Sequence, residues 1–267
     1  MLVGGFGLVL RRQWRQEQGE QTLIEVVPPA RATEDFDVLL TLEILEDPEQ
    51  RQAIREALSE LGYKILLANL HFIQPGSGTN GRRDIKVDFL APPVPAGSST
   101  LRERNIRVGP RNSTEQDKLH GYRTPEAELL LGNVLTVPLE GADTKGAEQQ
   151  VYVDLPHPFM LTLMKLHAFR DEYEGRKTEG QMQRALAAKH LADAYTLTAL
   201  LTRAESEELI QLASENASHP VVQDAAGIIG VLLADDQTPG TLLLRETLGI
   251  SADELDIFLD FLHSAYR

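Results

Sequence analysis

The sequence predicts an α+β protein in which a mixed sheet with flanking helices is followed by a helical lobe. Short apolar runs bounded by glycine and proline fill most of the first 155 residues, as is typical of strands. From Phe159 onward, apolar residues recur at helical spacing instead. One helix interrupts the strand-like half at residues 47–61. We therefore expect two domains, residues 1–155 and residues 156–267.

In the first half, the helix at 47–61 has the clearest signals. Asp47 can cap its N-terminus, Pro48 fits its first turn, and Gly62 ends it. Strands are expected on both sides of this helix. They are Thr22–Val27, Phe36–Leu42, Tyr63–Ile73 and Asp84–Leu90, with a turn over Gln74–Gly81.

The rest of the chain changes from strand to helix. Ala91–Ser99 contains three prolines and predicts a loop, and the basic segment 100–125 has no regular pattern. Further strands are expected at Leu129–Leu139 and Gln150–Leu155. Helices are expected from Phe159 to Arg170, at Met182–Leu201, and at 204–216, 219–234, 240–248 and 251–265.

Composition excludes several classes of protein. The chain of 267 residues has 40 acidic and 26 basic side chains and no cysteine. Disulfide scaffolds, thiolate zinc sites and cysteine nucleophiles are therefore excluded. No apolar run is long enough to span a bilayer, and the first residues do not resemble a secretory signal. We expect a cytoplasmic protein without a membrane partner.

The net charge of −14 is unevenly distributed. Residues 1–124 carry −1, residues 125–199 carry −4 and residues 200–267 carry −9. Basic side chains cluster in the first part, where they either bind a phosphate backbone or are simply solvated loop charges. These are Arg82, Arg83, Lys86, Arg102, Arg104, Arg107, Arg111, Lys118 and Arg123.

Common catalytic motifs are missing or out of context. Gly76–Gly81 matches the dinucleotide fingerprint G-x-G-x-x-G, but a strand rather than a helix follows it, which excludes a Rossmann site. No P-loop and no G-x-S-x-G elbow occurs. The seven histidines show no metal-ligand spacing, and we interpret them as packed or solvated side chains.

Three aspartates form a better candidate. Asp35 and Asp37 are two residues apart on an expected strand, so both side chains lie on one face. Asp88 lies in another apolar strand, where a charge is costly to bury unless it is paired or binds a metal. Carboxylate oxygens of this kind suit Mg²⁺, which is usually shared with substrate phosphates.

Together these segments resemble the polymerase-β-like nucleotidyltransferase superfamily, and in particular its branch of AbiEii-type toxins. The resemblance lies in Leu2–Leu10 with its glycine pair, Arg31–Asp37, the strand around Asp88, Leu163–Arg170 and Lys189–Asp193. It covers residues 2–201 and implies a nucleotidyltransferase-like sheet. The sequence departs from the family pattern at His190, which stands in place of an aspartate, and in a long gap between Gly5 and Asp35.

The resemblance also implies roles for individual residues. Asp35, Asp37 and Asp88 would hold Mg²⁺ as catalytic residues, with Asp88 on a second metal or as base for the acceptor hydroxyl. Lys165 would neutralise phosphate charge. The nucleotide would be bound by Gly4, Gly5, Arg31, Thr33, Lys189 and Asp193, although Lys189 and Asp193 are one helical turn apart and could simply pair with each other.

The family-level expectation is transfer of a nucleoside monophosphate from a nucleoside triphosphate (NTP) to a hydroxyl acceptor. The acceptor would be tRNA or another RNA, and the protein would be the toxin of a toxin–antitoxin or phage-defence pair, with a cognate antitoxin as partner. A small cationic acceptor such as an aminoglycoside is an alternative substrate. A different alternative is a catalytically degenerate fold that serves as a binding or assembly module.

Overall fold

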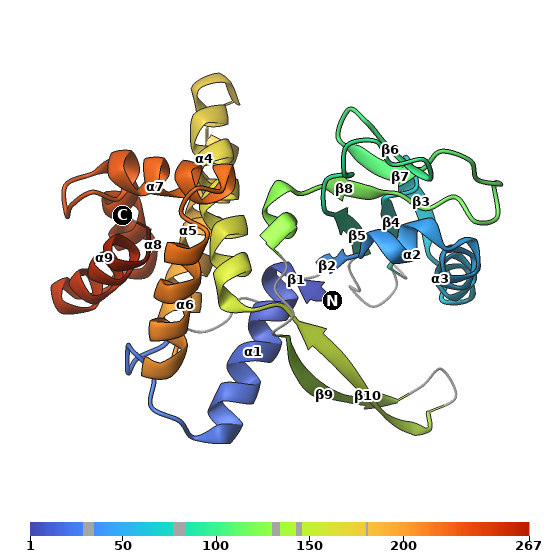
Figure 1. Cartoon of the computed structure of the whole chain (residues 1–267). Helices are drawn as coiled ribbons and strands as arrows, with labels where there is room; N and C mark the ends of the chain where they lie inside the picture. The colour runs from blue at the N-terminus through green and yellow to red at the C-terminus, as the bar shows by residue number, and fades with distance from the viewer. Residues whose placement is uncertain (29–34, 77–83, 130–133, 143–145, 180, 267) are drawn as a thin grey trace. The chain divides into compact units, whose positions relative to one another are not determined.

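The computed structural model describes residues 1–28, 35–76, 84–129, 134–142, 146–179 and 181–266 (Figure 1). The chain forms two compact units. Met1–Leu10 and Arg31–Pro156 make up unit 1, and Arg11–Ala30 and His157–Arg267 make up unit 2. The expected domain boundary after residue 155 lies next to this division, but residues 11–30 are grouped with the helical unit. No helix of the described segments combines the length and the apolar character needed to cross a membrane.

Unit 1 is a mixed α+β body, which confirms the expected fold class. Its elements in chain order are β1 (Leu2–Val3), the start of α1 (Gly4–Gln18), β2 (Asp35–Leu39), α2 (Leu42–Glu46), α3 (Pro48–Glu60), β3 (Lys64–Leu67), β4 (His71–Gln74), β5 (Ile85–Ala91), β6 (Leu101–Arg104), β7 (Arg107–Pro110), β8 (Gly121–Arg123), η1 (Pro125–Leu129), β9 (Leu135–Ala142) and β10 (Glu148–Leu155). The capping prediction for α3 is confirmed, since the Asp47 carboxylate accepts hydrogen bonds from the backbone N–H groups of Glu49 and Gln50.

The described strands of unit 1 form two sheets. In the larger sheet the order is β1-β2-β5-β8-β7-β6, and β4 pairs with β5 and β3 with β4. The pairs β2–β5 and β5–β8 are parallel, and the other pairs are antiparallel. β9 and β10 form a separate antiparallel ribbon. The open, mixed sheet with flanking helices therefore agrees with the sequence-based expectation at this coarser level.

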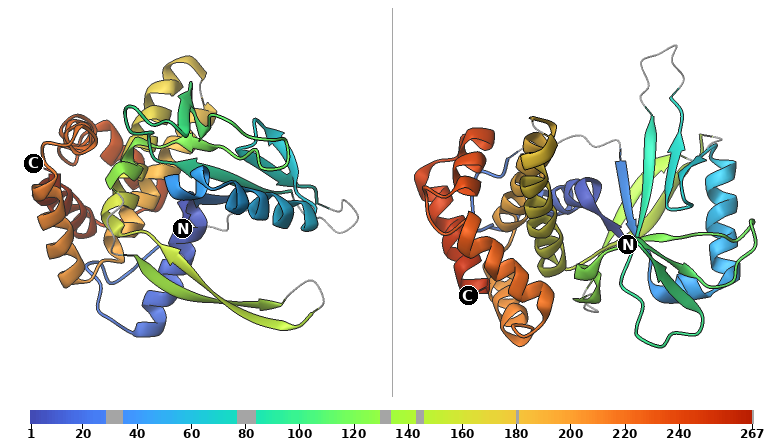
Figure 2. Two further views of the ribbon diagram at one scale, coloured as in Figure 1. Left: turned by 45° about the vertical axis from the view of Figure 1, so that its right-hand side comes forward. Right: turned by 90° about the horizontal axis from the view of Figure 1, so that it is seen from above.

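The two faces of the larger sheet differ in chemistry. Helices α2 and α3 cover one face (Figure 2), where a cluster of buried apolar side chains forms the core. Its members include Leu45, Leu58, Phe72, Phe89, Ala91, Leu101 and Val108. Because side chains alternate along a strand, the residues between these core positions lie on the opposite face. That opposite face, which we call the polar face, carries Asp37, Asp88 and Arg107.

Two expectations for unit 1 are wrong. The single strand expected at Tyr63–Ile73 is a hairpin, because Ala68 and Asn69 adopt positive φ values of 50° and 58° and turn the chain between β3 and β4. Segment 100–125, expected to be irregular, supplies three strands of the sheet. Its arginines obscured the strand pattern, since they alternate with the core residues Leu101 and Val108.

Unit 2 contains the remainder of α1 and the helices expected after residue 158. These are α4 (Pro158–Glu179), α5 (Gln181–Ala199), α6 (Arg203–Glu215), α7 (Pro220–Leu232), α8 (Pro239–Leu248) and α9 (Ala252–Tyr266). The strand expected at Thr22–Val27 is absent from this described segment. Leu23 and Ile24 instead donate backbone hydrogen bonds to Leu201 and Ala199 at the end of α5, and Ile24 is buried there.

Candidate functional site

The polar face of unit 1 brings two of the predicted carboxylates side by side. Asp37 on β2 and Asp88 on β5 are in register between adjacent parallel strands. Neighbouring strands are about 4.8 Å apart, so the two side chains leave the same face next to each other. Asp35 lies on the same face, two residues earlier on β2, opposite Lys86. The two strands that carry the predicted carboxylates are therefore adjacent in the sheet.

Gly4 lies against Asp37. Val3 pairs with Asp37 across β1 and β2, and the chain then turns into α1 with a Gly4 φ of 65°. A Cβ atom on Gly4 would come within 1.7 Å of the Asp37 Oδ2 atom. Only glycine satisfies both the left-handed backbone and this close approach.

The N-terminus of α1 begins at the same point. Gly4 and Gly5 are its first residues, and its first turn has no acidic side chain of its own. The first N–H groups of a helix lack partners within the helix and carry partial positive charge, which favours anions. A glycine pair, a helix start and the Asp37 carboxylate thus meet at one edge of the polar face.

Two basic side chains contact the aspartates, and we had not predicted these contacts. The His71 Nδ1 atom lies 2.6 Å from Asp88 Oδ1, and Lys86 Nζ lies 3.8 Å from Asp35 Oδ1. Both contacts are partly exposed, and the Lys86 pair is the more exposed and longer one. We had interpreted every histidine as packed or solvated, and the structure adds a polar contact of His71 with Asp88 that we had not expected. The antiparallel pairing of β4 with β5 places His71 opposite Asp88.

The donor set suits Mg²⁺ only in part. Within the described residues, no group of three or more His, Asp or Glu side chains is close enough to hold a metal ion. Mg²⁺ in phosphoryl-transfer sites is commonly bound by one or two carboxylates together with substrate phosphates. The neighbouring carboxylates of Asp37 and Asp88 meet that smaller requirement. The role of Asp35 as a third metal ligand stays a prediction.

The remaining predicted residues are in unit 2 or outside the described residues. Lys165 on α4 donates a hydrogen bond of 2.8 Å from Nζ to Asp193 Oδ2 on α5, and both side chains are buried. Asp193 therefore pairs with a lysine of the neighbouring helix, whereas we had considered a pair with Lys189 on its own helix. Lys189 is partly buried on α5. Arg31 and Thr33 lie outside the residues that the structure describes.

The chain matches no protein-family model, no curated protein and no solved structure.

Proposed function

We propose that the protein is a Mg²⁺-dependent nucleotidyltransferase whose site is built on Gly4, Asp37 and Asp88. The observation that carries the proposal is the meeting of a glycine-initiated helix with two in-register carboxylates on adjacent strands. The helix start binds phosphate, and the carboxylates bind a divalent cation. A nucleoside triphosphate with its bound metal ion requires a phosphate-binding helix start and metal-binding carboxylates at the same site.

Each group has a role in the transfer of a nucleoside monophosphate. The N–H groups of Gly4 and Gly5, at the start of α1, bind the β- and γ-phosphates. Asp37 and Asp88 would hold Mg²⁺, and the ion would neutralise the negative charge that develops on the phosphate oxygens. His71 orients the Asp88 carboxylate through the Nδ1 contact.

The bond changes follow from this placement. The acceptor hydroxyl oxygen forms a bond to the α-phosphorus, and the bond from that phosphorus to the β-bridging oxygen breaks. Pyrophosphate leaves with the bonding electron pair. The proton of the hydroxyl passes to the Asp88 carboxylate, which is partly exposed and therefore accessible to the acceptor.

RNA is the acceptor that we favour, with tRNA first, and the toxin of a toxin–antitoxin or phage-defence pair is the corresponding biological role. The basic side chains of β6 and β7 support this choice, since they lie on the polar face together with the aspartates. A cognate antitoxin would be the protein partner.

The test incubates the purified protein with Mg²⁺ and each of the four α-³²P nucleoside triphosphates in turn. The acceptor is total tRNA in one set of reactions and an aminoglycoside in the other, and the label transferred to each acceptor is measured. We expect labelled RNA with at least one nucleotide and no labelling in the presence of EDTA. Labelling of an aminoglycoside but not of RNA would contradict the choice of acceptor. Absence of transfer to both acceptors with all four nucleotides would contradict the enzymatic proposal.

A second candidate function is a degenerate fold that binds a partner without catalysis. The contacts of His71 with Asp88 and of Lys86 with Asp35 favour it, because nitrogen atoms of the protein already lie next to these two carboxylates. Calorimetric titration with Mg²⁺ and a non-hydrolysable triphosphate separates the two. If the protein is an enzyme, binding of Mg²⁺ and the triphosphate should depend on Asp37. If it is a binding module without catalysis, Asp37→Asn should leave the titration unchanged.

A further inference from the structure

Strands β6, β7 and β8 concentrate positive charge on the polar face. Arg102 and Arg104 alternate with Glu103 on β6, and Arg107 is in register with Arg104 on β7. Glu103 points to the other face, where it pairs with Arg123 at 3.0 Å. The alternation of the strand thus separates the one acidic residue of β6 from the arginines.

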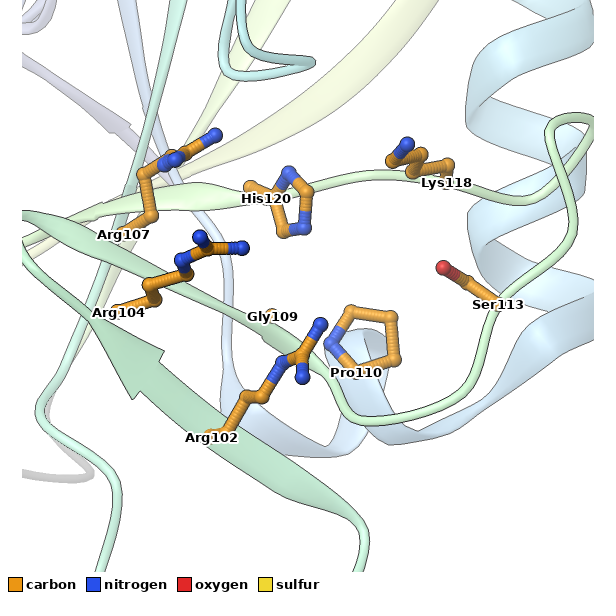
Figure 3. A pocket seen from close by; sticks show the side chains of 8 residues that line it. All are labelled: Arg102, Arg104, Arg107, Gly109, Pro110, Ser113, Lys118 and His120. Carbon is orange, nitrogen blue, oxygen red and sulfur yellow. The ribbon is translucent and has the colours of Figure 1, made fainter.

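These arginines border a pocket of about 170 Å³ (Figure 3). A water molecule occupies about 30 Å³ in the liquid, so the pocket has room for a larger polar group. In Figure 3 the side chains of the three arginines, Lys118 and His120 surround the space from three sides. The lining residues are Arg102, Arg104, Arg107, Gly109, Pro110, Ser113, Lys118 and His120.

The arginines of the pocket have no acidic partner in the part of the chain that the structure describes. Among the described residues, no carboxylate forms an ion pair with Arg102, Arg104 or Arg107, and Lys118 has only an exposed pair with Glu115. This lack is notable in a chain with a net charge of −14. Guanidinium groups held close together repel each other unless an anion lies between them.

His120 is fixed in the wall of the pocket. Its Nδ1 atom is 2.8 Å from the Ala68 carbonyl oxygen, and its ring lies over Gly109, where a Cβ atom would come within 2.0 Å of the ring. Burial lowers the pKa of His120, and the nearby charges of Arg107, Lys118 and Arg102 lower it further. The positive charges that line the pocket therefore disfavour a further positive charge on His120.

The loop that carries Ser113 and Lys118 is also anchored. Arg51 on α3 donates hydrogen bonds to the backbone oxygen and the carboxylate of Asp117, and both side chains are buried. Asp117 Oδ1 in turn accepts hydrogen bonds from the backbone and side chain of Thr114. The lining residues are thus held by a strand on one side and by an anchored loop on the other, which makes a preformed site.

The pocket shares its face with the aspartates. Leu90 follows Asp88 by two residues on β5, Leu90 is in register with Tyr122 on β8, and Tyr122 is in register with Arg107. Two strand spacings and one two-residue step put Asp88 and Arg107 roughly 12 Å apart. Tyr122 lies between them on the same face and is 40% exposed.

We propose that the pocket is a phosphate-binding site that holds a backbone phosphate of single-stranded RNA, with Tyr122 as a stacking surface for the adjacent base. Arginines bind phosphate through paired hydrogen bonds, and an exposed aromatic ring next to them is the usual platform for an unpaired base. The choice of RNA rests on the proposed function, since the acceptor must reach the aspartates from the pocket. The presence of a phosphate site does not depend on catalysis.

The test is fluorescence anisotropy of a labelled single-stranded oligoribonucleotide with the full chain and its variants. The double variant Arg102→Gln/Arg104→Gln removes two exposed charges from the pocket, and Lys64→Gln/Arg111→Gln removes the same charge from positions in unit 1 that do not line it. We expect the pocket variant to bind about tenfold more weakly and to show a smaller dependence on salt. The control is expected to bind like the wild type.

Further arms identify the ligand and separate this proposal from the proposed function. Tyr122→Leu is expected to weaken RNA binding, while binding of pyrophosphate stays unchanged. Asp37→Asn is expected to abolish label transfer but retain RNA binding. Equal losses in the pocket and control variants would overturn the site. Binding of pyrophosphate without binding of the oligoribonucleotide would overturn RNA as its ligand.

Discussion

The Asp37 carboxylate lies directly over Gly4, so close that a Cβ atom on Gly4 would come within 1.7 Å of Oδ2. This contact joins the start of α1 to the carboxylate edge of the sheet. It explains why a glycine is required at position 4, where φ is also positive.

Gly4→Ala is expected to reduce nucleotide binding and to lower the free energy of unfolding by more than 2 kcal/mol, because it adds a collision to the strain of the left-handed backbone. Gly62→Ala is the matched control, since Gly62 has a φ of 80° and nothing within 4 Å of the added Cβ atom. It is expected to cost only about 1 kcal/mol. Urea denaturation of both variants measures the difference, and equal costs would contradict the close contact.

His71→Ala is expected to reduce label transfer about tenfold and to raise the Mg²⁺ concentration required, because it removes the group that orients Asp88. The contact is partly exposed, so the free energy of unfolding should change by less than about 1 kcal/mol. Transfer rates across a Mg²⁺ titration give the first quantity and denaturation gives the second. An unchanged Mg²⁺ requirement would show that His71 does not position Asp88.

Asp117→Asn is expected to destabilise the protein by about 3–5 kcal/mol near pH 7, because the buried Arg51 charge loses its partner. Burial by itself raises the pKa of Asp117, but hydrogen bonds from Thr114 and Arg51 outweigh it and hold this pKa below its ordinary value. A lowered pKa contributes stability above the unfolded value of about 4, and that contribution is lost as the pH falls through the folded value.

The pH dependence provides the control for this prediction. The difference in unfolding free energy between the wild type and Asp117→Asn should therefore shrink as the pH falls below about 4. Glu60→Gln, on the exposed end of α3, also removes one carboxylate but leaves the pair of Arg51 with Asp117 intact, so it is the charge-matched control. A constant difference between pH 7 and pH 3 would indicate that Asp117 does not stabilise the fold through its charge.

Lys165 and Asp193 form a buried ion pair in unit 2, and their role can be separated from phosphate binding. Lys165→Met is expected to cost about 3–5 kcal/mol because it leaves the Asp193 carboxylate buried without this lysine. The double variant Lys165→Met/Asp193→Leu should recover most of that stability. If the pair only stabilises the fold, label transfer by the double variant should recover together with its stability. Recovered stability without recovered transfer would assign Lys165 to the reaction.

The sequence was sufficient for elements with strong local signals. The helix capped by Asp47 and helices α6 to α9 each have one apolar face that the sequence pattern indicates, and the structure contains them. The alternation in Asp35–Leu39 likewise indicated which residues share a face. For these elements, local preference and tertiary packing agree.

Elements that depend on distant partners were not predictable in this way. Thr22–Val27 has strand-like residues, but its hydrogen bonds go to the end of α5, far along the chain. The turn at Ala68–Asn69 requires positive φ values that neither residue type signals strongly. The contact of His71 with Asp88 depends on hairpin register, and the arginines of β6 and β7 became a pocket only through strand pairing.

The most direct test compares label transfer by Asp37→Asn, Asp88→Asn and Glu60→Gln with the wild type, at equal protein concentration and saturating Mg²⁺. All three substitutions remove one negative charge from unit 1, but only the first two change the in-register pair on β2 and β5. We predict at least a hundredfold lower transfer for the two aspartate variants, and wild-type transfer for Glu60→Gln. Wild-type transfer by Asp37→Asn or Asp88→Asn would contradict the central claim that these two carboxylates form the site.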